Sequence, residues 1–220
     1  MIPSRPPKKL GAQTEVFRGM MRSPMALDAI PKRIREKYRV EERGHASAIL
    51  AGDFRSEFHD IVECLDAFSL RRSYIMNPGG GRSQVPATID GFLRARGWSE
   101  KSFDIAITVD GNPVPIPTHK IDNFKNGVGV ETEWNNKTEF YDRDLNNFRL
   151  LKDLRVLAVG VIITRLSELR TLFTELGEWH KYGTTSTHWD KLMPKVDGGG
   201  AGGCPLLMVG IGAACYDPHS

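Results

Sequence analysis

Three acidic side chains lie close together in the segment HKIDNFKNGVGVETEWNN, residues 119–136. Asp122 comes nine residues before Glu131, and Glu133 follows Glu131 by two residues. Residues 127–134 are predicted to form a strand, on which alternate side chains point to the same face. Glu131 and Glu133 would then share one face at a separation of about 6–7 Å, because a strand rises about 3.3 Å per residue.

Two carboxylates at this separation repel each other and lose hydration when buried, so the arrangement is costly without a cation. Asp122, across a short turn predicted over 123–126, would supply a third oxygen ligand. Oxygen ligands suit a hard divalent cation, which can activate a water against a phosphate. The alternative is that Glu131 and Glu133 form the polar face of an exposed strand, and their spacing alone does not decide between the two.

The surrounding pattern favours a buried sheet. Val128, Val130 and Trp134 would occupy the opposite face of the acidic strand. A helix with Leu145, Phe148, Leu151 and Leu154 at helical spacing follows, and then an apolar strand over 156–164 that could be buried on both faces. Other predicted elements are helices over 56–68, 86–96 and 166–179, strands over 103–109 and 204–211, and a hairpin turn at Asp110 and Gly111.

The segment 118–165, which reads THKIDNFKNGVGVETEWNNKTEFYDRDLNNFRLLKDLRVLAVGVIITR, resembles the BglII/BstYI family of Type II restriction endonucleases. The resemblance extends to RSQVPATIDGFLRARGW at 82–98 and to CPLLMVGI at 204–211. It implies the PD-(D/E)XK restriction-endonuclease-like fold, an α/β fold with a central mixed β-sheet flanked by α-helices. It also implies a homodimer that requires Mg²⁺, for which Mn²⁺ could substitute.

By position, the resemblance makes Asp122, Glu131 and Glu133 the catalytic and metal-binding triplet. The superfamily usually has lysine in the third place, and many BglII-like enzymes have glutamine there. Glu133 instead resembles the second glutamate in the Glu-x-Glu of the related BamHI. Because glutamate cannot activate water as the ammonium group of lysine would, a metal-bound water must carry more of the chemistry. Glu100 follows Trp98 where relatives carry an acid near the metals, so it is either a further metal ligand or a surface charge at a helix exit.

Hydroxyl side chains gather in a loop after the predicted helix 166–179. They make good contacts to phosphates or base edges, and in the resemblance this region reaches into the major groove. Ser186 or Thr187 could equally cap a helix from His188, and both roles can hold at once. The predicted DNA contacts are His119, Lys120, Asn135, Asn136, Lys137, Tyr182, Thr184, Thr185, Ser186, Thr187 and His188. His119 is expected to orient the active-site strand or touch phosphate, and one of the two asparagines to cap a turn.

The length of 220 residues suits one domain with a sizeable core. Residues 1–30 are predicted to be a loosely ordered N-terminal segment. Residues 31–220 are predicted to form a single nuclease domain with the catalytic site, the DNA-recognition loops and the dimer interface. The formal net charge is only +3, but basic residues crowd the first forty positions, as either a DNA-binding arm or a solvated tail.

The cysteines and the hydropathy of the sequence indicate the cellular compartment. The three cysteines lack the spacing of metal ligands and indicate reduced thiols, as in a cytoplasm. The resemblance implies that this cytoplasm is bacterial or archaeal. The sequence has no apolar run of transmembrane length and no features of a signal peptide, so no membrane association is expected.

The sequence therefore predicts a Type II restriction endonuclease. It would hydrolyse double-stranded DNA at a short palindromic site with Mg²⁺ and leave 5′-phosphate ends, and a cognate DNA methyltransferase would protect the host. Two alternatives stay open. One is another PD-(D/E)XK nuclease, a repair or structure-specific enzyme. The other is a catalytically inactive DNA-binding relative, which the unusual Glu133 keeps open.

Overall fold

A six-stranded mixed sheet forms the centre of the protein, whose computed structural model describes residues 27–77, 83–183 and 185–220. Across the sheet, the strands in order are β1 (Tyr38–Arg43), β9 (Leu206–Ile211), β8 (Val159–Arg165), β7 (Val128–Glu133), β6 (Ile121–Lys125) and β3 (Ser99–Lys101). β9, β8 and β7 run parallel, whereas β1, β6 and β3 pair antiparallel with their neighbours.

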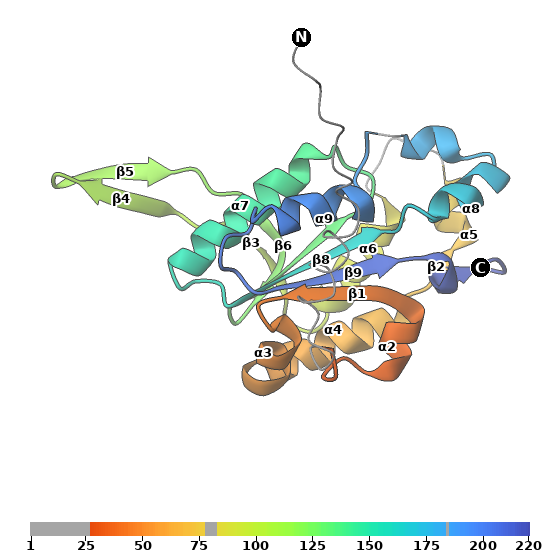
Figure 1. The fold of residues 1–220 in the computed structure, drawn as a ribbon, viewed down its shortest axis with the longest axis horizontal. Coiled ribbons are helices and arrows are strands. Elements are labelled where there is room, and N and C mark those ends of the chain that lie inside the picture. Colours follow the sequence, from red (N-terminus) through yellow and green to blue (C-terminus); the bar gives the residue numbers. More distant parts are fainter. Residues whose placement is uncertain (1–26, 78–82, 184) are drawn as a thin grey trace, which may run out of the picture.

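Helices cover both faces of this sheet (Figure 1). One face carries α7 (Glu139–Asp153) and α9 (Trp189–Asp197). The other packs against α2 (Lys32–Lys37), α3 (Ala46–Asp53), α4 (Arg55–Ala67), α6 (Gln84–Arg94) and α8 (Leu169–Glu175). The smaller elements are α5 (Arg72–Met76), the 3₁₀ turns η1 (Trp179–Tyr182) and η2 (Ala213–Cys215), and a short parallel pair of strands, β2 (Leu70–Arg71) and β10 (Tyr216–Asp217). No helix in the described ranges is long and apolar enough to cross a lipid bilayer.

Every residue of β7 is buried, and its apolar and acidic side chains lie on opposite faces. Val128, Val130 and Trp134 pack in the core beneath α4 and α6, as the alternating pattern predicts. Glu131 and Glu133 therefore point to the opposite face, toward α7. Both glutamates are 1% exposed, so the alternative of an exposed polar strand is wrong.

The predicted turn over 123–126 is misplaced, because residues 123–125 belong to strand β6. The chain reverses at Asn126 and Gly127, whose φ angles are 48° and 88°. An Asn-Gly pair with positive φ at both positions is the preferred two-residue hairpin turn, since its twist matches that of the flanking strands. This tight turn fixes the register of β6 against β7, and with it the position of Asp122.

Helix α7 packs against the sheet at a point where two glycines face it. A Cβ built on Gly160 would lie 2.5 Å from a ring carbon of Phe148 on α7. One built on Gly129 would lie 3.0–3.3 Å from Leu157, Ile121 and Phe148. The missing side chains let the helix approach the acidic face of β7, which brings polar groups of α7 within reach of the glutamates.

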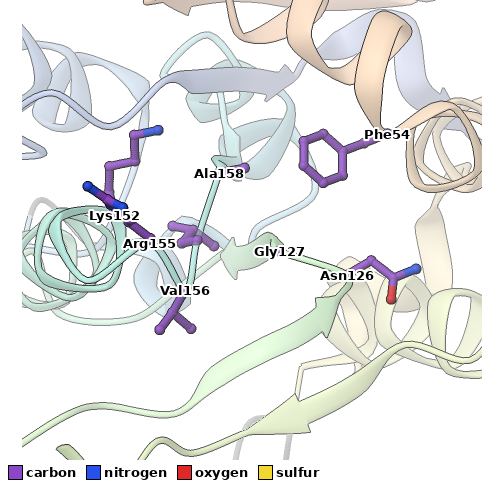
Figure 2. A pocket seen from close by; sticks show the side chains of 8 residues that line it. Phe54, Asn126, Gly127, Lys152, Arg155, Val156 and Ala158 are labelled. Atoms are coloured by element: carbon purple, nitrogen blue, oxygen red, sulfur yellow. The ribbon is translucent and has the colours of Figure 1, made fainter.

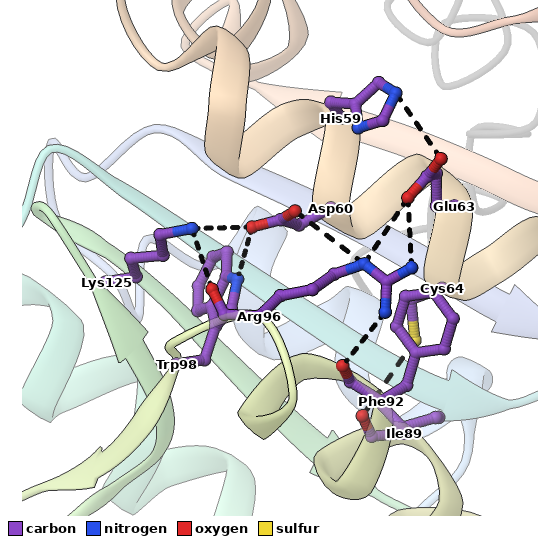
Figure 3. A network of polar contacts seen from close by, with 9 residues as sticks. All are labelled: His59, Asp60, Glu63, Cys64, Ile89, Phe92, Arg96, Trp98 and Lys125. Atoms are coloured by element: carbon purple, nitrogen blue, oxygen red, sulfur yellow. Dashed lines mark hydrogen bonds and ion pairs between the residues drawn. The ribbon is translucent and has the colours of Figure 1, made fainter.

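A second polar network ties the other layer to β6 (Figure 3). The largely buried Asp60 of α4 accepts hydrogen bonds from Lys125 Nζ at 2.8 Å and from Trp98 Nε1 at 3.0 Å. Arg96, just after α6, pairs with Glu63 of α4 at 3.2 Å. Lys125 lies three residues after Asp122, so this network anchors the strand that carries the first acid.

The hairpin of β4 (Ile105–Val109) and β5 (Asn112–Ile116) projects away from the sheet and its helices (Figure 1). Its turn lies at Asp110 and Gly111, as predicted. Ile107, Val109 and Val114 are 47%, 53% and 44% exposed. The hairpin therefore contributes little to the described core.

The N-terminal elements α2, β1 and α3 were not predicted, and α8 is shorter than the predicted helix 166–179. Ile30 is 2% exposed, so the core already includes a residue that the predicted boundary assigned to the N-terminal segment. Among the basic residues, Arg33 pairs with Asp66, and Lys37 donates to three carbonyl groups at the end of α4. Residues 1–26 lie outside the described ranges.

We expect Gly160→Ala to lower the free energy of unfolding by about 1–3 kcal/mol, because the added methyl group overpacks the contact with Phe148. Gly91→Ala in α6 is the matched control, since a Cβ there meets no atom within 4 Å. It should leave the protein as stable or make it more stable by up to about 1 kcal/mol. Chemical denaturation of both variants tests this, and equal stabilities would show that α7 does not depend on the glycine.

Candidate active site

The three predicted acids meet where β6 and β7 run side by side. The register pairs Asn123 with Val130, so one step further places Asp122 opposite Glu131. The backbone N–H of Asp122 donates to Glu131 Oε2, and that of Thr132 donates to Asp122 Oδ2, both at 3.4 Å. Glu133 lies next along the same face of β7. The spacing in the sequence therefore brings these side chains together, as predicted.

A fourth acid, Asp144, joins them from α7 and was missed in the sequence. It is 0% exposed, and its charge raises the pKa of both Glu131 and Glu133. The signal was present in the helical periodicity. Asp144 precedes Phe148 by four residues, so it lies on the stripe that faces the sheet. An acid on an apolar stripe is a departure from the pattern that could have been noticed.

Burial dominates the electrostatics of this cluster. It raises the pKa of Glu131 well above the usual value, and the charges of Asp144 and Asp122 raise it further. Burial and then Asp144 raise the pKa of Glu133 from 4.5 to about 8, against a lowering effect of the hydrogen bond from Asn136. Burial also raises the pKa of Asp144, although Arg143 beside it lowers it. The cluster thus favours either protons or a cation.

Two carboxylate oxygens in the cluster are buried and accept no hydrogen bond from any described residue, namely Glu131 Oε1 and Asp144 Oδ2. Oxygen atoms of this kind are ligands that a hard divalent cation prefers, so the donor chemistry fits Mg²⁺. Within the described ranges, however, no group of three or more Asp, Glu, His or Cys side chains is arranged to hold a metal ion as it stands. A metal would therefore require these carboxylates to adjust.

Three other predicted residues, Glu100, His119 and Lys120, lie at the solvent-exposed rim of the cluster. Lys120 Nζ lies 3.0 Å from Glu100 Oε2 in an exposed ion pair on the β3 edge. Glu100 is therefore outside the buried group. The carbonyl of His119 accepts a hydrogen bond from Asn147 Nδ2 of α7 at 2.9 Å. Burial lowers the pKa of His119, and the charge of Arg143 lowers it further.

The residues after β7 support the third acid. Asn136 Nδ2 donates to Glu133 Oε2 at 2.7 Å, so it orients the glutamate. Asn135 Nδ2 donates to the carbonyl of Lys181 at 2.8 Å, which ties this turn to η1. Lys137 is exposed and forms a backbone bridge with Ser186. The hydrogen bond from Asn136 to the third acid was not expected from the sequence.

The hydroxyl loop is arranged differently from the prediction. Tyr182, Ser186 and Thr187 are 4%, 8% and 0% exposed, which is at odds with direct DNA contact by their side chains. The Tyr182 ring stacks on Phe173 at 3.9 Å. Helix α9 has no side-chain cap, so the predicted capping role is wrong. Thr185 is exposed and His188 is partly buried, while Thr184 lies outside the described residues.

A buried arginine holds this loop in place. Arg165, at the end of β8, is 1% exposed. Its Nη2 donates to Ser186 Oγ at 2.7 Å and to the carbonyl of Tyr182 at 3.1 Å, and its Nε donates to the carbonyl of Trp134 at 3.2 Å. Arg165 therefore fastens the loop to the end of the acidic strand, a role that no sequence pattern indicated.

A separate hollow of about 450 Å³ opens at the other end of β7 (Figure 2). It lies about 20 Å from Glu133, given six residues of strand at about 3.3 Å each. No acid contributes to its lining, which is formed by Phe54, Asn126, Gly127, Lys152, Arg155, Val156, Leu157 and Ala158. It is therefore distinct from the acid cluster.

A mixed sheet flanked by helices, with paired carboxylates on two adjacent strands, is the architecture of the restriction-endonuclease-like PD-(D/E)XK nucleases. A family model described as restriction endonuclease BglII/BglIII matches residues 38–211. The chain therefore belongs to this family and is a Type II site-specific endonuclease, a hydrolase that acts on double-stranded DNA. A comparison with curated proteins finds no match.

The raised pKa of Glu133 predicts a stability that falls with rising pH in the metal-free protein. Below the usual value of 4.5, Glu133 is protonated in both the folded and unfolded states and contributes nothing. Between 4.5 and about 8 the folded state holds the proton that the unfolded chain has lost, so stability declines as pH rises. Melting curves in chelator should show this decline, and Glu133→Gln should reduce it. Parallel profiles for both proteins would contradict the burial of a titrating Glu133.

We expect Ser186→Ala to destabilise the protein by about 1–3 kcal/mol, because it removes an acceptor from the buried Arg165. Thr185→Ala, on an exposed neighbour, is the control and should change stability little. Melting curves of both variants are recorded, and the affinity of each variant for cognate and scrambled duplexes is measured alongside. Loss of cognate binding by Ser186→Ala at unchanged stability would instead support a DNA contact.

Proposed function

We propose that the protein cleaves both strands of DNA at a short palindromic site, as a homodimer, with Mg²⁺ held by Asp122, Glu131 and Glu133. Buried carboxylates that face one another, with oxygen atoms lacking hydrogen bonds, are the observation that carries this proposal. A cation would relieve their repulsion, whereas an inactive DNA-binding relative would gain nothing from it. Mn²⁺, another oxygen-preferring cation, is proposed as a substitute.

When bound, a divalent cation supplies an activated water and neutralises charge on the leaving oxygen. The residues of the chain position the reaction. Asp122 and Glu131 hold the ligand oxygens across two strands, and Asn136 fixes the carboxylate of Glu133. Breaking the bond between phosphorus and the 3′ oxygen leaves a 5′-phosphate end. Glu100, on the rim, is proposed to adjust the charge near His119.

DNA is proposed to lie along the rim, where predicted contact residues are accessible. Lys120, Asn135, Lys137 and Thr185 are exposed, and His119 and His188 are partly exposed. Lysines attract the phosphates in a salt-dependent manner, whereas the neutral side chains are suited to positioning contacts or base edges. A homodimer would give one active site per strand, because two-fold symmetry in the protein matches that of a palindrome.

The cellular setting follows from the same proposal. An enzyme that cuts the host's own sites requires protection, for which a cognate DNA methyltransferase is the proposed partner. The three cysteines are buried and form no disulfide with one another. Reduced thiols support a cytoplasmic location.

Digestion of unmethylated plasmid with and without Mg²⁺ tests the function directly. We expect discrete bands, and sequencing of the ends should show one palindromic site with 5′-phosphates. A smear would support a repair or structure-specific nuclease, and intact plasmid with a gel shift would support an inactive DNA-binding protein.

We expect Asp122→Asn and Glu131→Gln to slow cleavage by more than about a hundredfold, because a metal site supplies several kcal/mol of transition-state stabilisation. The control is Asp142→Asn on α7, whose exposed carboxylate pairs with Lys195 outside the cluster. Single-turnover rates and circular dichroism spectra are compared. If a folded variant at position 122 or 131 cuts as fast as the control, the site is wrongly assigned.

A further inference from the structure

A guanidinium group stands beside the acid cluster, and neither the sequence analysis nor the proposed mechanism uses it. Arg143, on α7, lies with Nη2 3.6 Å from Glu133 Oε1. Its Nε and Nη2 reach the same oxygen of Asp144, Oδ1, at 2.9 and 2.8 Å. The side chain is 30% exposed, whereas those of Glu133 and Asp144 are 2% and 0% exposed. Arg143 therefore spans the border between the buried acids and solvent.

The guanidinium is held in one orientation. Asp144 binds it through two of its nitrogens, and the guanidinium carbon lies 4.0 Å from the centre of the Phe140 ring. A planar group fixed by a carboxylate and an aromatic face loses little freedom when it binds a ligand. Such an arrangement suits recognition of a fixed anionic group.

Arg143 also has donor capacity left over. Among the described residues, its Nη1 makes no hydrogen bond, and the side chain is accessible from the rim. When the four acids are ionised to hold a cation, one guanidinium offsets only part of their negative charge. A phosphate approaching these acids meets repulsion, and a guanidinium fork is the group that best offsets it.

We propose that Arg143 contacts the scissile phosphate, and that Asp144 is the positioning residue that aims it. The inference rests on the proposed function. It adds a positively charged side chain to an acid triplet that has Glu133 where the superfamily usually has lysine. Arg143 would bind the phosphate in the ground state and stabilise the charge that develops as the bond breaks. Asp144 acts only indirectly, through its hydrogen bond with Nε and its ion pair with Nη2 of the guanidinium.

The matched variants are Arg143→Gln and Arg149→Gln. Both remove one positive charge from α7, but Arg149 is exposed and six residues further along the helix. We expect Arg143→Gln to slow single-turnover cleavage of the plasmid by about a hundredfold or more, the range for loss of one transition-state donor. Arg149→Gln should cut like the wild type. Arg143→Lys, which keeps the charge but not the fork, should recover part of the rate.

Binding separates a phosphate contact from a structural role. The probes are two duplexes with the site found by end sequencing, one natural and one with an uncharged methylphosphonate at the scissile position, in Ca²⁺ instead of Mg²⁺. We expect Arg143→Gln to bind the natural duplex about tenfold more weakly than the wild type, and the modified duplex equally well. Asp144→Asn should give a smaller loss with the same selectivity.

Equal weakening on both duplexes would overturn the inference, as would cleavage by Arg143→Gln at the rate of Arg149→Gln. If Arg143→Gln does not fold, judged by circular dichroism, Arg143→Lys takes its place in the same comparison. Absence of any cleavage by the wild type would overturn the proposed function as well. Normal cleavage by the wild type with no effect at position 143 would overturn this inference alone.

Discussion

The burial of three carboxylates beside the partly exposed Asp122 is the constraint on which this structure depends. Acids in a sheet that is buried on both faces lose hydration and repel each other. The free energy that this costs must be offset by other contacts in the fold. The contacts in the protein offset only part of this repulsion and loss of hydration. They come from two backbone N–H groups, from Asn136, and from Arg143 at the edge. An unfavourable cluster of this kind is typical of a site that works with a ligand.

The rest of the fold makes that cluster rigid. The hairpin turn at Asn126 and Gly127 sets β6 in register with β7, and the network around Asp60 ties β6 to the helices behind it. From the other side, α7 approaches through the gap left by Gly129 and Gly160. The strands and the helix that carry the acids are thus placed by different contacts, so the geometry of the site depends on the whole sheet.

Local sequence patterns were sufficient for the strands but not for the full site. The alternation of Val128 and Val130 with Glu131 and Glu133 gave the correct faces of β7, because a strand has a period of two. The turn was misplaced by treating 123–126 as a loop, although Asn126-Gly127 is the stronger turn signal. Asp144 was missed although the apolar stripe of α7 predicts that it faces the sheet, whereas Arg165 was missed because its partners lie far away in the chain. Burial of Ser186 likewise depends on Arg165, which no local pattern reveals.

The projecting hairpin of β4 and β5 carries a safeguard in its own sequence. Exposed strands with apolar side chains invite other chains to add on by backbone pairing. Pro113 and Pro115 lie in β5, and both are paired in register with β4. Proline is tolerated in a strand where the missing N–H would have faced away from the partner, so the loss falls on the outer edge. Two absent donors in a five-residue strand prevent a continuous ladder on the outer edge of β5, which disfavours the addition of another chain there.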